Sequence, residues 1–160
     1  MEAAIADRDF SAFGELAMRD SNSFHATCAD TWPPIFYMDD ASRAAVRVCE
    51  RVNEGRGGEI VCAYTFDAGP NAVVFYEAVE EAYVLGAFRA IVGGVEGWEG
   101  IEGLDGTSVQ SPLHVDEKIA SVLRAGVSRV ILTGVGEGPI SRTEHLIDEY
   151  GNVVGVSIGK

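Results

Sequence analysis

Two short apolar segments on either side of a turn are the feature that most constrains the fold of this chain. Residues 60–66 and 72–76 are rich in valine, isoleucine, tyrosine and phenylalanine, which favour β-strands. The residues between them, DAGPN (67–71), suit a chain reversal. The sequence therefore predicts an antiparallel hairpin that carries a carboxylate, Asp67, where its first strand ends.

A long helix is predicted before the hairpin. Asp9 can cap it, and Trp32-Pro33-Pro34 would stop it, because proline lacks a backbone donor and restricts the preceding residue. At helical spacing its apolar stripe would consist of Phe10, Phe13, Ala17, Phe24 and Cys28. We expect that stripe to face a sheet or another helix.

Three further helices are predicted: one that starts after Asp39-Asp40 and ends at Gly55, one over 79–92, and one from Pro112 to Gly126. The first of them has apolar residues at i, i+3, i+4 and i+7, namely Ala45, Val48, Cys49 and Val52. The stretch over 93–106 is too rich in glycine for a helix or strand interior and predicts a loop.

Two more strands are expected, over 129–133 and 153–158. Together these elements predict an α+β fold with helices packed on one face of an antiparallel sheet. At 160 residues, the chain 1–160 is expected to form a single domain with one core.

The charge and the cysteines exclude several classes of protein. With a formal net charge of -13 and no basic patch, the chain is not expected to bind nucleic acid or anionic membranes. Cys28, Cys49 and Cys62 are odd in number and lack CxxC spacing, so they predict core residues rather than disulfides or a zinc site. No signal peptide or membrane-spanning run is visible, which favours a cytoplasmic protein.

Asp67 is the first candidate functional residue. An aspartate at the start of a turn often serves only to accept backbone N–H groups. However, no Lys or Arg lies within five residues to neutralise it. A carboxylate fixed at this position could orient or deprotonate a substrate hydroxyl.

Ser21, Asn22 and His25 are the second candidate group. They fall at the edge of the apolar stripe of the first helix, which would border either solvent or a cleft. A structural hydrogen-bonding role is the alternative for His25. A Ser-His-Asp triad with Asp67 is discounted, because no nucleophile elbow or oxyanion loop is present. The glycine-rich turn at 134–139 is a weak phosphate site at best, since GxxxxGK[ST] is absent.

Three segments resemble a known family. DSNSFHATCADTWPPIFYMDD (20–40), AYTFDAGPNAV (63–73) and RVILTGVGEGP (129–139) are similar to the C-terminal half of the diphosphomevalonate decarboxylases, members of the GHMP kinase superfamily. They occur in the family's order and at comparable spacing, and the resemblance covers roughly residues 4–147. It implies a ferredoxin-like sandwich with helices over a four-stranded antiparallel sheet, and an active site in a cleft shared with an N-terminal half.

The resemblance also implies a reaction and roles for residues. Members use ATP and Mg²⁺ to phosphorylate mevalonate 5-diphosphate, and then release phosphate and carbon dioxide to give isopentenyl diphosphate, a step of isoprenoid and sterol biosynthesis. Asp67 matches the family's essential aspartate, Ala68 and Gly69 follow it in the motif, and Ser21, Asn22 and His25 match the motif on the helix beside the cleft. We expect these neighbours to support Asp67 or the substrate, with no metal ligands among them.

The chain also departs from the family. It lacks the N-terminal half that carries the phosphate loop and the groups gripping the diphosphate, so the chain alone is predicted to be inactive, and its partners would be that half and a second copy in a homodimer. The alternatives are a related mevalonate-pathway kinase, or a non-catalytic dimerisation or regulatory module.

Overall fold

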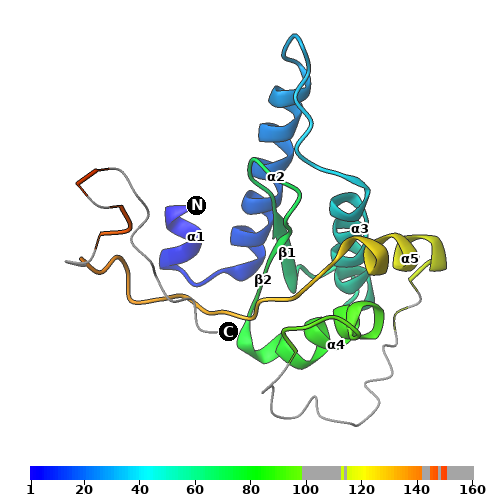
Figure 1. Cartoon of the computed structure of the whole chain (residues 1–160). Coiled ribbons are helices and arrows are strands. Elements are labelled where there is room, and N and C mark those ends of the chain that lie inside the picture. Colours follow the sequence, from blue (N-terminus) through cyan, green and yellow to red (C-terminus); the bar gives the residue numbers. More distant parts are fainter. Residues whose placement is uncertain (99–112, 114, 142–144, 148, 151–160) are drawn as a thin grey trace.

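The structure, a computed structural model, is α+β and centres on the predicted hairpin (Figure 1). It describes residues 1–98, 113, 115–141, 145–147 and 149–150. Strands β1 (Cys62–Thr65) and β2 (Val73–Tyr76) pair antiparallel, with Ala63 opposite Phe75. The helices are α1 (Glu2–Ala6), α2 (Phe10–Ala29), α3 (Asp40–Gly55), α4 (Glu81–Val92), which follows the 3-10 turn η1 (Ala78–Glu80), and α5 (Glu117–Gly126).

The helix starts follow from local capping. The side chain of Asp9 accepts a hydrogen bond from Ala12 N at 2.9 Å, so the predicted cap at Asp9 is confirmed. Asp39 caps α3 in the same way. The predicted start of the last helix at Pro112 is wrong, because Asp116 caps α5 further along the chain by accepting from Lys118 N at 2.8 Å.

The face that α2 buries overlaps the predicted apolar stripe at Ala17, but its buried positions are all small residues. Its buried residues are Gly14, Ala17 and Ser21, whereas Phe24 is 42% exposed. A Cβ added at Gly14 would lie 2.8 Å from Ile60 Cγ2 and 3.1 Å from Ala63 Cβ. The helix backbone therefore comes very close to β1, which only small side chains permit.

Helices lie on both faces of the hairpin. Alternate residues of a strand point to opposite faces, and α2 contacts the face of Ala63 and Phe75, where the Phe13 and Phe75 rings meet edge-on at 5.3 Å. Cys62 belongs to the other face, where its Sγ contacts Cys49 O of α3 at 3.7 Å. The expectation of helices on one face only is therefore wrong for the described residues, and Figure 1 shows the hairpin between α2 and α3.

The main core lies between the hairpin, α3, α4 and α5. The predicted apolar residues of α3 are all buried in it, and its fully buried side chains are Val48, Val52, Val84, Cys49 and Cys62. The prediction that the cysteines are core residues is confirmed for Cys49 and Cys62, whereas Cys28 is half-buried. The hydrogen bond with Cys62 and burial raise the pKa of the Cys49 thiol, so it stays protonated.

The four-stranded sheet remains a prediction, because the described residues form only two strands. The strand expected over 129–133 is wrong: Arg129 makes only an isolated parallel bridge to Glu96 there. The strand expected over 153–158 and most of the glycine-rich loop lie outside the described residues. Among the helices that are described, none is long and apolar enough to cross a membrane.

Candidate active-site cleft

Asp67 lies two residues after the end of β1 and lines a cleft of about 330 Å³ between that strand and α2. Its side chain is exposed, and within the described residues its carboxylate has no hydrogen bond or ion pair. The cleft residues are Asp20, Ser21, Ser23, Phe24, Thr27, Thr65, Phe66 and Asp67. The carboxylate is therefore available to a ligand in this cleft.

Ser21 holds the main chain immediately before Asp67. Its Oγ accepts a hydrogen bond from Phe66 N at 3.0 Å and lies 3.5 Å from Phe66 O, to which it donates. Ser21 is only 3% exposed, so these bonds replace water for a strand end that α2 covers. The sequence placed Ser21 at the polar edge of the helix, but the structure places it in the contact with β1.

Asn22 and His25 extend the same contact. Asn22 Nδ2 donates to the Tyr64 hydroxyl at 3.1 Å, and His25 Nε2 lies 3.3 Å from Phe66 O. Because a carbonyl oxygen only accepts, this bond requires the proton on Nε2. Ser21, Asn22 and His25 thus bind the two residues Tyr64 and Phe66 that precede Asp67, and none of the three binds its carboxylate.

The turn after Asp67 is open on its outer side. Gly69 N donates to Asp67 O at 2.8 Å, which closes the first bend of the turn. A Cβ added at Gly69 would meet no atom of the described residues within 4 Å, and Ala68 is exposed. The space beside Ala68 and Gly69 is therefore open.

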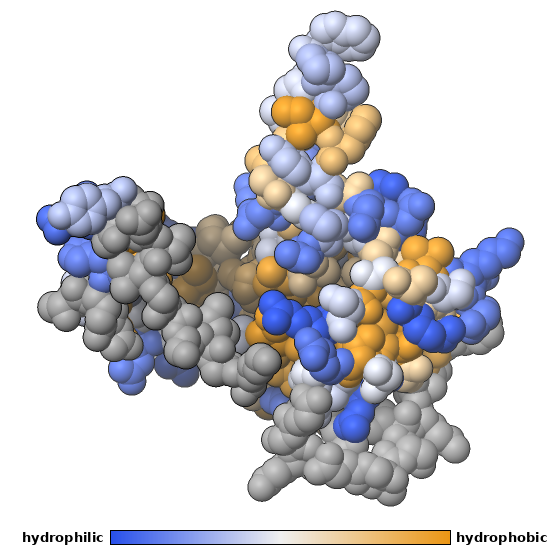
Figure 2. Space-filling model, viewed as in Figure 1, coloured by the Kyte–Doolittle hydropathy of each residue, from blue (hydrophilic) through white to orange (hydrophobic). Residues whose placement is uncertain are grey.

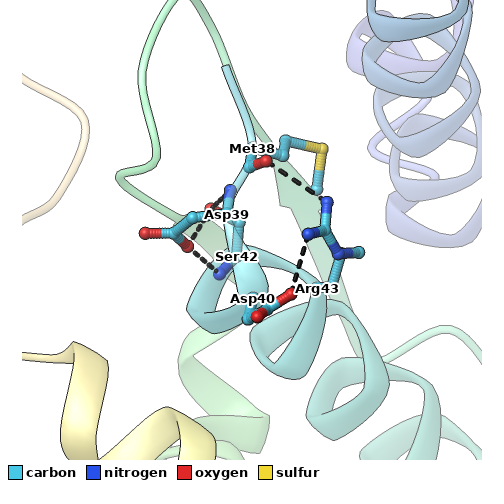
Figure 3. Close-up of polar contacts among 5 residues, drawn as sticks. All are labelled: Met38, Asp39, Asp40, Ser42 and Arg43. Carbon is cyan, nitrogen blue, oxygen red and sulfur yellow. Dashed lines mark hydrogen bonds and ion pairs between the residues drawn. The ribbon is translucent and has the colours of Figure 1, made fainter. Parts of the chain in front are cut away.

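The far end of this turn is held by α3, through a residue that the sequence did not single out. Ser42 Oγ donates to Pro70 O at 2.8 Å, and Ser42 is 1% exposed. The same side chain closes a capping box with Asp39: Asp39 Oδ1 accepts from Ser42 N at 2.8 Å, and Ser42 Oγ accepts from Asp39 N at 3.2 Å (Figure 3). The pattern Asp39-x-x-Ser42 indicates the cap from sequence, but not its reach to Pro70.

The capping box affects a titrating group. The hydrogen bond from Ser42 N is the largest cause that lowers the pKa of Asp39 below its ordinary value of 3.8. Figure 3 also shows Arg43 on the next turn of α3, where it binds Met38 O at 3.2 Å and Asp40 at 2.8 Å. Several polar contacts therefore fix the start of α3 beside the Asp67 turn.

The cleft lacks groups for nucleotide or diphosphate. Among the described residues its charged lining consists of two carboxylates, Asp20 and Asp67, with no basic side chain, and the neighbouring Arg19 pairs with Glu15 at 3.0 Å. In the part of the chain that the structure describes, no group of His, Cys, Asp and Glu could hold a metal ion. The glycine-rich turn at 134–139 does not line the cleft. The described residues therefore do not fit ATP and Mg²⁺ by themselves.

A second, shallower hollow lies between α3 and α5. It has a volume of about 460 Å³ and an apolar floor that includes Met38, Val46 and Ile119. Figure 2 shows apolar surface gathered over these helices with polar side chains around it. The basic side chains at this hollow include Arg43 and Arg47, which pair with Asp40 and Glu50.

Comparison with known proteins gives a consistent result. The model of the mevalonate 5-diphosphate decarboxylase C-terminal domain matches residues 1–142. Diphosphomevalonate decarboxylase of Aspergillus fumigatus is 50% identical over 96% of this chain and 39% of its own length, and that of Gibberella zeae is 55% identical over 91% and 37%. A crystal structure of mevalonate 5-diphosphate decarboxylase superposes with a TM-score of 0.72 at 39% identity, covering 94% of this chain and 40% of the other.

These matches settle the family and its limits. The chain spans about two fifths of the length of the relatives that it matches. The match runs through the cleft and the turn that carries Asp67. The chain therefore belongs to the mevalonate 5-diphosphate decarboxylase C-terminal domain family.

Proposed function

We propose that this chain is the C-terminal part of an ATP-dependent decarboxylase that converts mevalonate 5-diphosphate to isopentenyl diphosphate, a carbon-carbon lyase of the mevalonate pathway. The observation that carries the proposal is the position of Asp67. In a member of this family, the aspartate of the DAGPN motif lies in a cleft with its carboxylate unpaired among the described residues.

In this proposal Asp67 acts on the tertiary hydroxyl of the substrate. The carboxylate accepts the hydroxyl proton, or orients it, while the oxygen attacks the terminal phosphate of ATP. Loss of phosphate and carbon dioxide then leaves the double bond of the product. Ser21, Asn22 and His25 fix the strand end from which Asp67 projects, and Ala68 and Gly69 leave room for substrate beside it.

The groups that hold the phosphates are proposed to lie outside this chain. Two polyanions need several charge-assisted contacts, and the cleft offers two carboxylates instead. The chain alone is therefore proposed to be inactive and to require an N-terminal half. A homodimer, a cytoplasmic location and a single domain over 1–160 also stay predictions.

The test uses this chain joined to the part of the Aspergillus fumigatus relative that it does not match. Substrate labelled in its carboxyl group reports decarboxylation as released carbon dioxide. We expect Asp67→Asn to lower kcat by at least about 100-fold, because a positioned general base typically contributes that much or more. The isosteric amide keeps the shape of the side chain and removes its basicity.

Asp30→Asn is the matched control, since Asp30 is an exposed residue at the end of α2 and does not line the cleft. Retention of kcat within about threefold in Asp67→Asn, a change below about 0.7 kcal/mol, would refute the role of Asp67. ATP consumption and product phosphorylation without release of carbon dioxide would point to a mevalonate-pathway kinase instead. Absence of any turnover in the joined protein would favour a non-catalytic module.

A further inference from the structure

The buried polar side chains of the described residues both bind the segment around Asp67. The described residues contain two polar side chains that are buried, Ser21 at 3% and Ser42 at 1% exposure. They come from different helices, and both bind main-chain groups of the segment that carries Asp67. Ser21 binds Phe66, directly before Asp67, and Ser42 binds Pro70, three residues after it.

Capping does not fully account for Ser42. Its N–H and Oγ complete the box with Asp39, which satisfies the start of α3 locally. The single hydroxyl proton has two acceptors in reach, Asp39 Oδ1 at 3.0 Å and Pro70 O at 2.8 Å. The Asp39 carboxylate already accepts a hydrogen bond from Ser42 N. The bond from Ser42 Oγ to Pro70 O, by contrast, joins segments 28 positions apart in the sequence. The Pro70 bond is therefore a tertiary contact to the Asp67 turn.

We infer that Ser42 is a positioning residue for the reaction, which holds the Asp67 turn from its far side while Ser21 holds the near side. The inference rests on the proposed function of Asp67. Ser42 does not line the cleft, so it acts on the substrate only through the placement of that carboxylate. A turn fixed at both ends limits the excursions of Asp67, and misplacement of a catalytic group by about 1 Å can cost about 100-fold in rate.

The test measures kcat and KM of the joined protein with Ser42→Ala and with Asp39→Ala. Both changes weaken the cap of α3, but only Ser42→Ala removes the hydroxyl that donates to Pro70 O. Asp39→Ala keeps that hydroxyl and removes its other acceptor, Asp39 Oδ1. We expect Ser42→Ala to lower kcat at least about tenfold with KM changed less than about threefold, since Asp67 is proposed to act in the transition state. Asp39→Ala should keep kcat within about threefold of the parent.

A double variant distinguishes positioning from general loosening of the fold. If Ser42 acts through Asp67, adding Ser42→Ala to Asp67→Asn should lower kcat by less than about threefold further. Multiplicative losses in the double variant, or equal losses in Ser42→Ala and Asp39→Ala, would overturn the inference. If Ser42→Ala does not fold, Ser42→Cys, which keeps the volume with a weaker donor, replaces it in the same comparisons.

The experiments distinguish failure of the proposed function from failure of the role proposed for Ser42. An active Asp67→Asn variant removes the proposed function, and with it the basis of the inference. An inactive Asp67→Asn variant together with a fully active Ser42→Ala variant leaves the proposed function intact and removes the role of Ser42 alone.

Discussion

The side chain of Asn53 makes three tertiary hydrogen bonds, and its removal should lower the free energy of unfolding. Its Oδ1 accepts from Val61 N at 2.9 Å and from Cys62 N at 3.0 Å, and its Nδ2 donates to Cys62 O at 2.9 Å. Val61 and Cys62 are buried, at 6% and 0% exposure. One side chain near the end of α3 thus replaces water for the start of β1.

The magnitude follows from these contacts. Each hydrogen bond contributes about 1 kcal/mol net, so the three lost in Asn53→Ala predict a decrease of about 3 kcal/mol in the free energy of unfolding.

Urea unfolding followed by the fluorescence of the buried Trp98 measures this change. Asn71→Ala is the matched control, because Asn71 is exposed and its side chain makes no hydrogen bond among the described residues; it should stay within about 0.5 kcal/mol of the parent. A loss below about 1 kcal/mol in Asn53→Ala, or an equal loss in Asn71→Ala, would refute the reasoning.

Two further predictions concern other polar groups. Tyr83 Oη is buried with no hydrogen-bond partner among the residues that the structure describes, while Arg56 lies over the ring at 4.1 Å. Tyr83→Phe keeps the ring and removes the unpaired hydroxyl, so the urea midpoint should be unchanged or higher; a loss above about 1 kcal/mol would contradict this. The hydrogen bond from Ser42 N lowers the pKa of Asp39 in the folded chain, so the stabilisation is present above the ordinary value of 3.8 and is lost as the pH falls through the lower folded value. The stability difference between the parent and Asp39→Asn should therefore shrink from about pH 6 to about pH 2.5, and a constant difference in urea titrations would exclude this linkage.

The sequence predicted the elements whose signals are local. The cap at Asp9 and the regular spacing of apolar residues in α3 depend only on neighbours along the chain, and the structure confirms both. The hairpin was predictable for the same reason, because its strand residues and its turn are adjacent. Helix α1 was missed, since five residues are too few for a clear periodic pattern.

The contacts between elements were not predictable in this way. The predicted stripe of α2 faces the hairpin, but Ala17 is its one buried member, because the close approach of the helix backbone to β1 selects small side chains at Gly14, Ala17 and Ser21. Asp67 stood out as an unpaired carboxylate in a turn, and the structure places it at a cleft. The contact of Ser42 with Pro70 depends on how α3 meets the turn, which no local pattern encodes.

The side chains that bind β1 also have a consequence for self-association. Cys62, at the start of β1, and Phe66, just after its end, are four residues apart. Main-chain groups of every second residue point to the same edge of a strand, and here that edge faces away from β2. Asn53 occupies those groups at one end of this edge and Ser21 occupies them at the other. A strand from another molecule could pair with this edge only after displacing the side chains of Asn53 and Ser21. These two side chains therefore oppose the edge-to-edge pairing that leads to aggregation.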